Sequence, residues 1–300
     1  MLRRLIAEDA DEIALVVCQP DRPQGRGRKV SAPPVKTVAL ETGIDVVQPT
    51  RLKDEALAAR LRAHQVDLAL VVAYGRILPK AVFEAPTFHT WNVHASLLPY
   101  HRGAAPIQHA ILAGDAETGV TLMQLSEGMD EGDMLLIRRI PLDAHETAGT
   151  LTTRLAALGA EILVEGIAMA KTGGLTRVPQ ENDKATYAPR IEKIEGDLDL
   201  NQSAANLARR VRAFSPWPGT SIAFGEADRL KILRAEVTSI SFPSAEPGQI
   251  VSLNPFVVQT GDGQLLLTEV QPPGKRPMDA ASFLHGAGRY LHIGTPLSAC

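Results

Sequence analysis

The most informative part of this chain is Asn92-Val93-His94-Ala95-Ser96-Leu97-Leu98-Pro99, followed by Arg102-Gly103-Ala104-Ala105-Pro106. A carboxamide and an imidazole stand two residues apart in an apolar run, and a β-strand turns such residues to the same face. In an α/β sheet, ligands bind at the carboxyl ends of the strands. We therefore predict a strand over 90–94 that presents Asn92 and His94 to a ligand.

Carboxylates follow on a Gly-rich turn, Glu127-Gly128-Met129-Asp130-Glu131-Gly132-Asp133. A carboxamide can donate a hydrogen bond to an oxyanion, an imidazole can move protons, and a carboxylate can hold the imidazole. If Asn92, His94 and Asp130 converge, they form an acyl-transfer site.

The spacing alone leaves alternatives to this site. Acids in Gly-rich turns commonly accept hydrogen bonds from their own backbone, and a polar residue near a strand end is usually structural. Glu131 and Asp133 compete for the role of the carboxylate, and His101 and His109 compete for the role of the imidazole.

Apolar runs alternate with helical patterns around this stretch. Strands are predicted over 13–17, 66–72, 90–94, 120–125 and 134–140, and helices over 52–64, 105–112 and from 147 to a Gly-Gly stop at 173–174. This alternation predicts an α/β fold, a doubly wound and mostly parallel sheet with helices on both faces.

The pattern changes after about residue 175. Residues 176–199 indicate a linker, polar as far as 189, and 200–213 indicate one helix. Short strands are predicted over 221–224, 230–237, 248–251, 256–260 and 265–270, with a helical turn at 280–286. Turns rich in Gly and Pro between short strands predict a small OB-like β-barrel. The predicted domains are therefore 1–175 and 200–300.

Composition narrows the class of protein. Three hundred residues suit two domains, and 45% hydrophobic with 22% charged residues is typical of a globular chain. A net charge of -3 argues against a globally basic nucleic-acid binder. Two cysteines supply neither a disulfide framework nor a metal set, and no apolar run is long enough for a membrane span. We expect a cytoplasmic protein with no metal and no membrane partner.

A basic segment, Gln19-Pro20-Asp21-Arg22-Pro23-Gln24-Gly25-Arg26-Gly27-Arg28-Lys29, holds four cations and one acid. Its Pro and Gly residues predict an irregular loop, and a solvated loop is the simplest interpretation. The alternative is a loop that orders on a phosphate backbone through its cations, because Arg pairs bidentately with phosphates or guanine edges. The glycines do not form a dinucleotide-binding fingerprint, since the third glycine is missing.

Several motifs together resemble the formyltransferase family that uses 10-formyltetrahydrofolate. They are the run 92–108, the run Ala113-Gly114-Asp115-Ala116-Glu117-Thr118-Gly119-Val120-Thr121, and the segment 128–134. The segments 19–29, Ala73-Tyr74-Gly75-Arg76-Ile77-Leu78-Pro79 and Phe214-Ser215-Pro216-Trp217-Pro218-Gly219 resemble the members that act on tRNA. The resemblance covers nearly the whole chain.

The resemblance implies a role for each matching position. Asn92, His94 and Asp130 correspond to the catalytic residues of the family. Its folate-contacting stretch corresponds to Ser96, Leu97, Leu98 and Pro99, and its tRNA-binding loop to the segment that holds Arg22, Arg26, Arg28 and Lys29. The C-terminal barrel resembles the domain that holds the tRNA body.

The implied reaction moves a formyl group from 10-formyltetrahydrofolate to the α-amine of methionyl-initiator tRNA, for translation initiation. The amine attacks directly, while Asn92 and a protonated His94 donate hydrogen bonds to the oxyanion and Asp130 favours the charged ring. We expect a monomer. The alternatives are a formyltransferase for a small amine, a formyl-folate hydrolase, and a non-catalytic tRNA- or folate-binding remnant.

One departure from the family pattern concerns the start of the chain. Family members begin with a strand and a Gly-Thr-Pro-x-Phe-type turn before the helix that opens here at Met1-Leu2-Arg3-Arg4-Leu5. Without that strand, unpaired backbone groups would cost more than the typical stability of about 5–15 kcal/mol. We expect Met1 to be an internal methionine of a longer protein.

Overall fold

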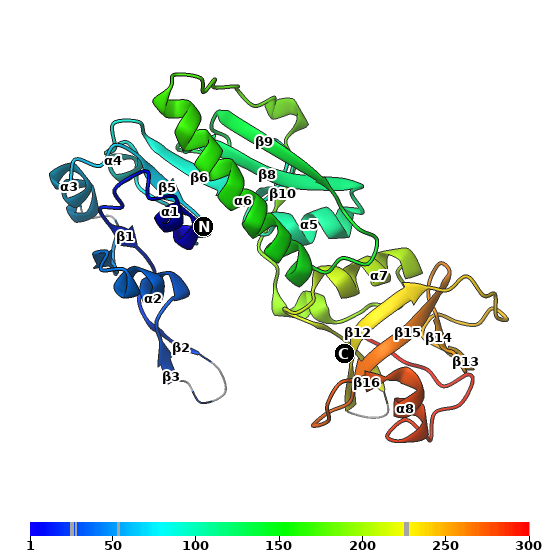
Figure 1. Cartoon of the computed structure of the whole chain (residues 1–300). Coiled ribbons are helices and arrows are strands. Elements are labelled where there is room, and N and C mark those ends of the chain that lie inside the picture. Colours follow the sequence, from blue (N-terminus) through cyan, green and yellow to red (C-terminus); the bar gives the residue numbers. More distant parts are fainter. Residues whose placement is uncertain (25–26, 28, 53–54, 225–227, 300) are drawn as a thin grey trace. The chain divides into compact units, whose positions relative to one another are not determined.

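A computed structural model describes all residues except 25, 26, 28, 53, 54, 225–227 and 300 (Figure 1). The chain forms two compact units. The first consists of Met1–Ala104, Gly119–Ile140 and Arg154–Tyr187, and the second consists of Ala105–Thr118, Pro141–Thr153 and Ala188–Cys300. Each unit is described by itself.

The first unit is built on a four-stranded sheet in the order β5-β6-β8-β9. Its strands are β5 (Ala69–Val71), β6 (Thr90–His94), β8 (Glu117–Gln124) and β9 (Met134–Pro141). A separate parallel pair joins β1 (Val16–Val17) to β4 (Val46–Val47). Among the described residues, β1 and β5 therefore each have a ladder along one edge only.

The α/β fold class is confirmed, and the sheet is mixed in direction. β5 and β6 run parallel, whereas β8 runs antiparallel to β6, with Trp91 opposite Gln124 and His94 opposite Thr121. A direct antiparallel neighbour needs no helical crossover, so the short helix before β8 does not impose a parallel pairing. The turn after β8 therefore begins beside Trp91.

Helix α6 (Ala148–Lys171) runs along this sheet (Figure 1). Its glycines allow a close approach, because a side chain at Gly159 would meet Val93 and one at Gly166 would meet Leu122. Val93 thus faces α6. Since successive side chains of a strand alternate, Asn92 and His94 point to the opposite face of β6.

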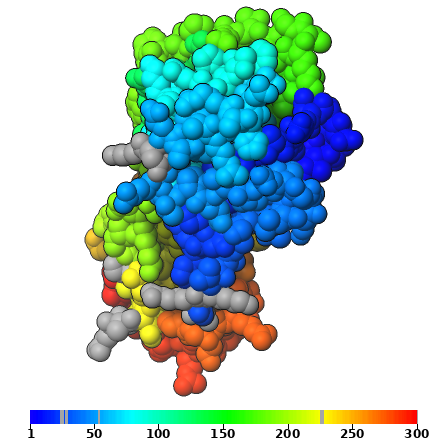
Figure 2. Space-filling view, turned by 90° about the vertical axis from the view of Figure 1, so that its left-hand side faces the viewer, coloured from blue at the N-terminus to red at the C-terminus, as the bar shows by residue number. Residues whose placement is uncertain are grey.

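The first unit contains further helices and short strands outside these ladders. They are α1 (Leu2–Glu8), β2 (Arg22–Gln24), β3 (Lys29–Ser31), α2 (Pro34–Glu41), α3 (Ala56–Ala63), α4 (Lys80–Phe83), β7 (Arg102–Gly103), η1 (Asn182–Lys184) and β10 (Tyr187–Ala188). The early elements, blue to cyan in Figure 2, form one continuous surface.

The prediction of an irregular basic loop is wrong for part of that segment. β2 and β3 form an antiparallel pair, with Pro23 opposite Val30. A two-stranded hairpin consists of edge strands only, and an edge strand tolerates a proline that cannot donate to the ladder.

The second unit contains the predicted β-domain. Its antiparallel sheet has the order β11-β12-β15-β14-β13, and β16 pairs with β15. The strands are β11 (Thr220–Phe224), β12 (Asp228–Val237), β13 (Ile250–Leu253), β14 (Phe256–Gln259), β15 (Gln264–Gln271) and β16 (Met278–Asp279). The helical elements are α5 (Pro106–Ala113), η2 (Lys193–Gly196), α7 (Ala204–Ala213) and α8 (Ala280–His285).

The last residues of the chain connect the two ends of this sheet. Ser298 bridges Ala223 in β11, and Pro296 bridges Gln249 next to β13. The core beneath the strands includes Leu207 of α7, which is fully buried. A closed curl of short antiparallel strands over one core is the arrangement that the turn-rich pattern predicts.

Substituting Gly119 tests the packing of β8 on β9. A methyl group at Gly119 would overlap the carbonyl oxygen of Arg138 and the Leu97 side chain. We expect Gly119→Ala to lower the free energy of unfolding in urea by about 1–3 kcal/mol. Gly174→Ala is the control, because its methyl group would meet only ordinary contacts at 3.7 Å. Equal stability of the two variants would contradict this packing.

Candidate active site

Strand β6 carries two of the three predicted catalytic side chains. His94 is buried, with 5% of its surface exposed, and Asn92 is half-buried. The strand covers 90–94 as predicted, and its alternation turns both side chains to one face.

The turn after β8 brings Asp130 to these residues. The carboxylate accepts hydrogen bonds from Asn92 Nδ2 at 3.3 Å and from the backbone N–H of Gly103 at 3.0 Å. Its Oδ2 lies 3.6 Å from His94 Nδ1. Asp130 adopts a left-handed φ of 51°, which Asp tolerates better than most residues. The predicted convergence of Asn92, His94 and Asp130 is therefore present.

The geometry also determines which nitrogen of His94 carries the proton. Nε2 lies 2.9 Å from the carbonyl oxygen of His101, and a carbonyl oxygen can only accept. Nε2 is therefore the protonated nitrogen of the neutral ring, and Nδ1 is the atom that can accept a proton.

Burial controls the charge of His94. Loss of solvent lowers the pKa of the imidazole, while the nearby Asp130 carboxylate and the His101 carbonyl raise it in part. Because the net shift is downward, the ring is neutral at pH 7. The predicted protonated His94 belongs to the tetrahedral intermediate, so it stays a prediction, and the sequence pattern does not show how completely the resting ring is buried.

The alternative residues have other contacts. The Asp133 backbone carbonyl accepts from Gln124, and Glu131 is exposed on the turn. His109 Nδ1 lies 2.9 Å from the carbonyl oxygen of Ala105 in its own helix. His101 contributes its carbonyl to His94. Asp130, by contrast, uses its side chain to contact both Asn92 and His94.

The predicted folate-contacting stretch forms a buried loop. The side chains of Ser96, Leu97 and Leu98 are buried, and Pro99 is half-buried. Ser96 Oγ donates to the Tyr100 carbonyl at 2.6 Å, and Thr121 Oγ1 donates to the Ser96 carbonyl at 2.8 Å. The side chains therefore support the loop, and a ligand above it would meet chiefly backbone groups.

The sequence analysis missed Gln180, which lies in the segment predicted to be a linker. Gln180 is buried, and Nε2 donates to the carbonyl oxygens of Asp130 at 2.8 Å and Gly132 at 2.7 Å. No local pattern identifies it, because its partners lie about fifty residues earlier in the chain. Its one sequence signal is a polar amide within a short segment that follows a long helix.

The basic hairpin is held at its base. Asp21 accepts from Lys36 Nζ at 2.8 Å and from Gln48 Nε2 at 2.7 Å, and these hydrogen bonds lower the pKa of its carboxyl. Arg22 is exposed and donates to Gln19 Oε1 at 3.2 Å. Of the other predicted tRNA-binding residues, Lys29 lies in β3, whereas Arg26 and Arg28 lie outside the described residues.

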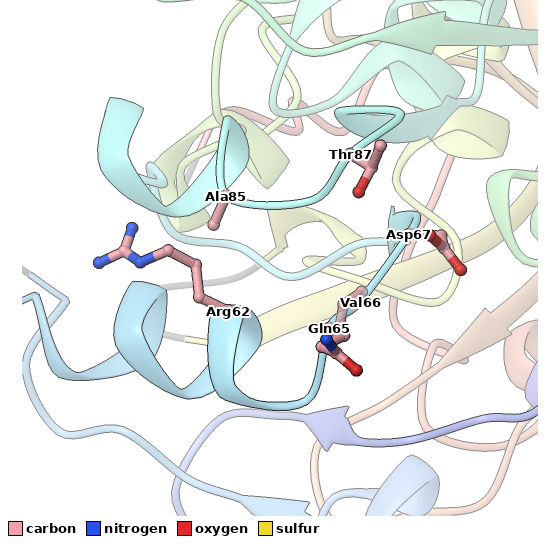
Figure 3. A pocket seen from close by; sticks show the side chains of 6 residues that line it. All are labelled: Arg62, Gln65, Val66, Asp67, Ala85 and Thr87. Carbon is pink, nitrogen blue, oxygen red and sulfur yellow. The ribbon is translucent and has the colours of Figure 1, made fainter.

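A surface hollow lies at the opposite end of the strands. It is lined by Arg62, Gln65, Val66, Asp67, Ala85 and Thr87 (Figure 3). The segments that carry Val66 and Thr87 precede β5 and β6, so the hollow lies at their amino ends. Arg62 and Asp67 stand on opposite sides of it in Figure 3. Without converging polar groups, this hollow is a weaker candidate than the site at His94.

Two kinds of feature are absent from the described part of the chain, a group of metal ligands and a membrane-spanning helix. No three His, Cys, Asp or Glu side chains are grouped there to hold a metal ion. No described helix is long and apolar enough to cross a membrane.

Comparisons with known proteins agree with this geometry. Residues 1–167 match the family described as Formyl transferase, and residues 190–288 match Formyl transferase, C-terminal domain. The chain belongs to the formyl transferase family. The methionyl-tRNA formyltransferase of Symbiobacterium thermophilum is 45% identical over 298 residues, which cover 98% of this chain and 90% of that relative. The Myxococcus xanthus methionyl-tRNA formyltransferase is 47% identical over 277 residues, covering 92% and 88%.

A solved structure shows the same fold. The N-formyltransferase from Helicobacter canadensis, in complex with folinic acid and dTDP-3-aminofucose, superposes with a TM-score of 0.64. It is 17% identical, and the match covers 90% of this chain and 94% of that chain. The family matches and the relatives above 40% identity confirm the resemblance to the formyltransferase family.

The buried His94 predicts a pH dependence of stability. Its pKa is lowered in the folded state, so the unfolded chain binds a proton first as the pH falls through about 6.5, and the folded state loses stability. We expect the free energy of unfolding to fall more between about pH 7.5 and pH 5.5 in the unmodified protein than in His94→Gln. Urea titrations measure both. An equal or smaller fall in the unmodified protein would contradict the effect of burial on this ring.

Proposed function

We propose that this chain transfers a formyl group from 10-formyltetrahydrofolate to the α-amine of methionyl-initiator tRNA, for translation initiation. The observation that carries the proposal is the convergence of Asn92, His94 and Asp130 on one face of β6. Relatives that are 45–47% identical over nearly the whole chain, and that are named methionyl-tRNA formyltransferase, support this acceptor. The Helicobacter canadensis neighbour, solved with folinic acid, supports a folate donor.

The reaction begins at a neutral imidazole. As the amine nitrogen attacks the formyl carbon, the carbonyl electron pair moves to the oxygen and the nitrogen gains a positive charge. His94 Nδ1 accepts a proton from that nitrogen, and the Asp130 carboxylate stabilises the imidazolium that forms. Burial disfavours the protonated imidazole before the attack, so Nδ1 is free to accept the proton.

Asn92 supplies the hydrogen bond to the oxyanion. Its carboxamide nitrogen carries two hydrogens, and one of them points to Asp130. The other is the donor that we assign to the oxyanion. When the intermediate collapses, the folate nitrogen leaves with its bonding electron pair and His94 returns the proton to it, so the protons balance.

Two features favour the tRNA acceptor over a small amine. The chain carries an exposed Arg22 on a hairpin anchored through Asp21, and it carries the C-terminal domain that its tRNA-acting relatives span. From residue 190 to the end, eleven Lys and Arg balance eleven Asp and Glu, so that domain would bind tRNA through a local face. We also propose a cytoplasmic, monomeric protein without a membrane partner.

The catalytic assignment predicts a loss of turnover without a loss of binding. Removal of an oxyanion-hole donor typically lowers kcat by about 10²–10³. We expect Asn92→Ala and His94→Ala each to lower kcat for the formylation of methionyl-tRNA by at least that factor, while tRNA binding survives. Formylation with 10-formyltetrahydrofolate and filter binding of tRNA measure the two effects.

A matched control separates the site from histidines in general. His64 is exposed at the end of α3, and His64→Ala should leave kcat unchanged. Near-normal kcat in Asn92→Ala or His94→Ala would contradict the proposed catalytic role of that residue. Folded protein without any formylation of methionyl-tRNA would instead favour the binding remnant.

The hairpin predicts a salt dependence. Each phosphate neutralised by a cation contributes about 0.7 to 0.9 to the slope of log K against log salt. We expect the triple variant Arg22→Ala, Arg26→Ala, Arg28→Ala to bind tRNA more weakly and with a flatter slope. Arg51→Ala, which removes an exposed cation outside the hairpin, is the control. An unchanged slope in the triple variant would contradict the role of the hairpin.

A further inference from the structure

Arg102 is the largest fully buried side chain of the protein among the described residues. Its guanidinium binds amide oxygens. Nε and Nη2 donate to Gln180 Oε1 at 2.9 and 2.7 Å, and Nη2 also donates to Asn182 Oδ1 at 2.7 Å. A buried cation is costly unless its donors are satisfied, so these contacts hold Arg102 in one orientation.

Both ends of the Gln180 carboxamide are fully hydrogen-bonded. The oxygen accepts two hydrogen bonds from Arg102, and the nitrogen donates one to each of the carbonyl oxygens of Asp130 and Gly132. A carboxamide offers two donor hydrogens and two acceptor lone pairs, so every position is occupied. With Arg102 fixing the oxygen, the nitrogen can face only the turn.

Three consecutive residues close this network around the proposed catalytic group. The His101 carbonyl accepts from His94, the Arg102 side chain holds Gln180, and the Gly103 N–H donates to the Asp130 carboxylate. The segment is itself anchored, because the Arg102 N–H donates to the Thr186 carbonyl at 2.9 Å. The backbone and the side chain of Asp130 are thus fastened to one short segment by separate routes.

We propose that Gln180, oriented by Arg102, is a positioning residue that sets the Asp130 carboxylate against His94. The inference rests on the proposed catalytic role of Asp130. Asp130 holds a left-handed backbone conformation, which the turn would relax without the two hydrogen bonds from Gln180. Gln180 touches no reacting atom and acts only through the turn.

Gln180→Glu is the variant that tests the proposal. The carboxylate has the same size and still accepts from Arg102, but it presents an oxygen, in place of two N–H groups, to two carbonyl oxygens. We expect kcat to fall about 10- to 100-fold, because small misplacements of a catalytic group cost that much. The KM values for methionyl-tRNA and for 10-formyltetrahydrofolate should stay close to those of the unmodified protein.

Gln259→Glu is a control that makes the same chemical change in the other unit. Gln259 Nε2 also donates to two carbonyl oxygens of a turn, those of Thr260 and Gly263. It should lower stability without lowering kcat in folded protein. An equal loss of kcat in Gln259→Glu would overturn the proposal, because the effect would then not depend on Asp130.

A double-variant cycle with Asp130→Asn separates positioning from a general structural role. If Gln180 acts through Asp130, Gln180→Glu lowers kcat in the Asp130 protein and adds little in Asp130→Asn. The same factor in both backgrounds would overturn the inference and leave the proposed function intact. Full activity in Asp130→Asn would overturn the role of Asp130 and the inference with it.

Gln180→Asn keeps the test decisive if Gln180→Glu does not fold. Asparagine retains the carboxamide but is one methylene shorter, so it cannot reach both Arg102 and the turn. We expect Gln180→Asn to lower kcat less than Gln180→Glu does, and again only when residue 130 is Asp. Cooperative thermal unfolding shows whether the variant is folded. An unchanged kcat in folded Gln180→Asn would overturn the proposal.

Discussion

One backbone hydrogen bond, from the Gly103 N–H to the Asp130 carboxylate, sets the geometry on which the rest of the site depends. It ties β7 to the turn after β8, and within the described residues no strand pairing joins these two segments. With the carboxylate held there, Asn92 reaches one oxygen while His94 faces the other. A charge-assisted bond to a backbone donor is rigid, since the donor has no rotamers of its own. The site is therefore pre-formed before any substrate arrives.

The same geometry places two effects on His94 in opposition. Burial favours the neutral ring, and the Asp130 carboxylate favours the charged one. At rest burial prevails, so the ring can accept a proton. The amine nitrogen becomes far more acidic once it carries a positive charge, and its proton then meets a base whose charged form already has a partner, the Asp130 carboxylate. A solvent-exposed carboxylate acting as the base in place of His94 would be charged before the reaction and would lose that charge on accepting the proton. The buried His94 is instead neutral at rest and gains a charge that Asp130 stabilises.

The sequence predicts the strand at the site well and its surroundings poorly, for physical reasons. The sequence predicts β6 over 90–94 because an apolar run with period 2 is a local signal. The predicted catalytic residues carry distinct chemistry in recognisable motifs. Gln180 and the antiparallel pairing of β8 depend on contacts between distant segments, which periodicity does not record. The β2–β3 hairpin contradicts local propensity, because its proline is tolerated on an edge.

Gln180 places an uncharged carboxamide beside Arg102, so that Asp130 is the carboxylate of the Arg102–Gln180–Asp130 network. A glutamate would pair with the buried guanidinium more strongly, but it would offer no donor to the Asp130 and Gly132 carbonyls. A carboxamide serves the cation and the carbonyls together at no net charge. Because Gln180 is uncharged, the Asp130 carboxylate is the negative charge in this network that faces His94.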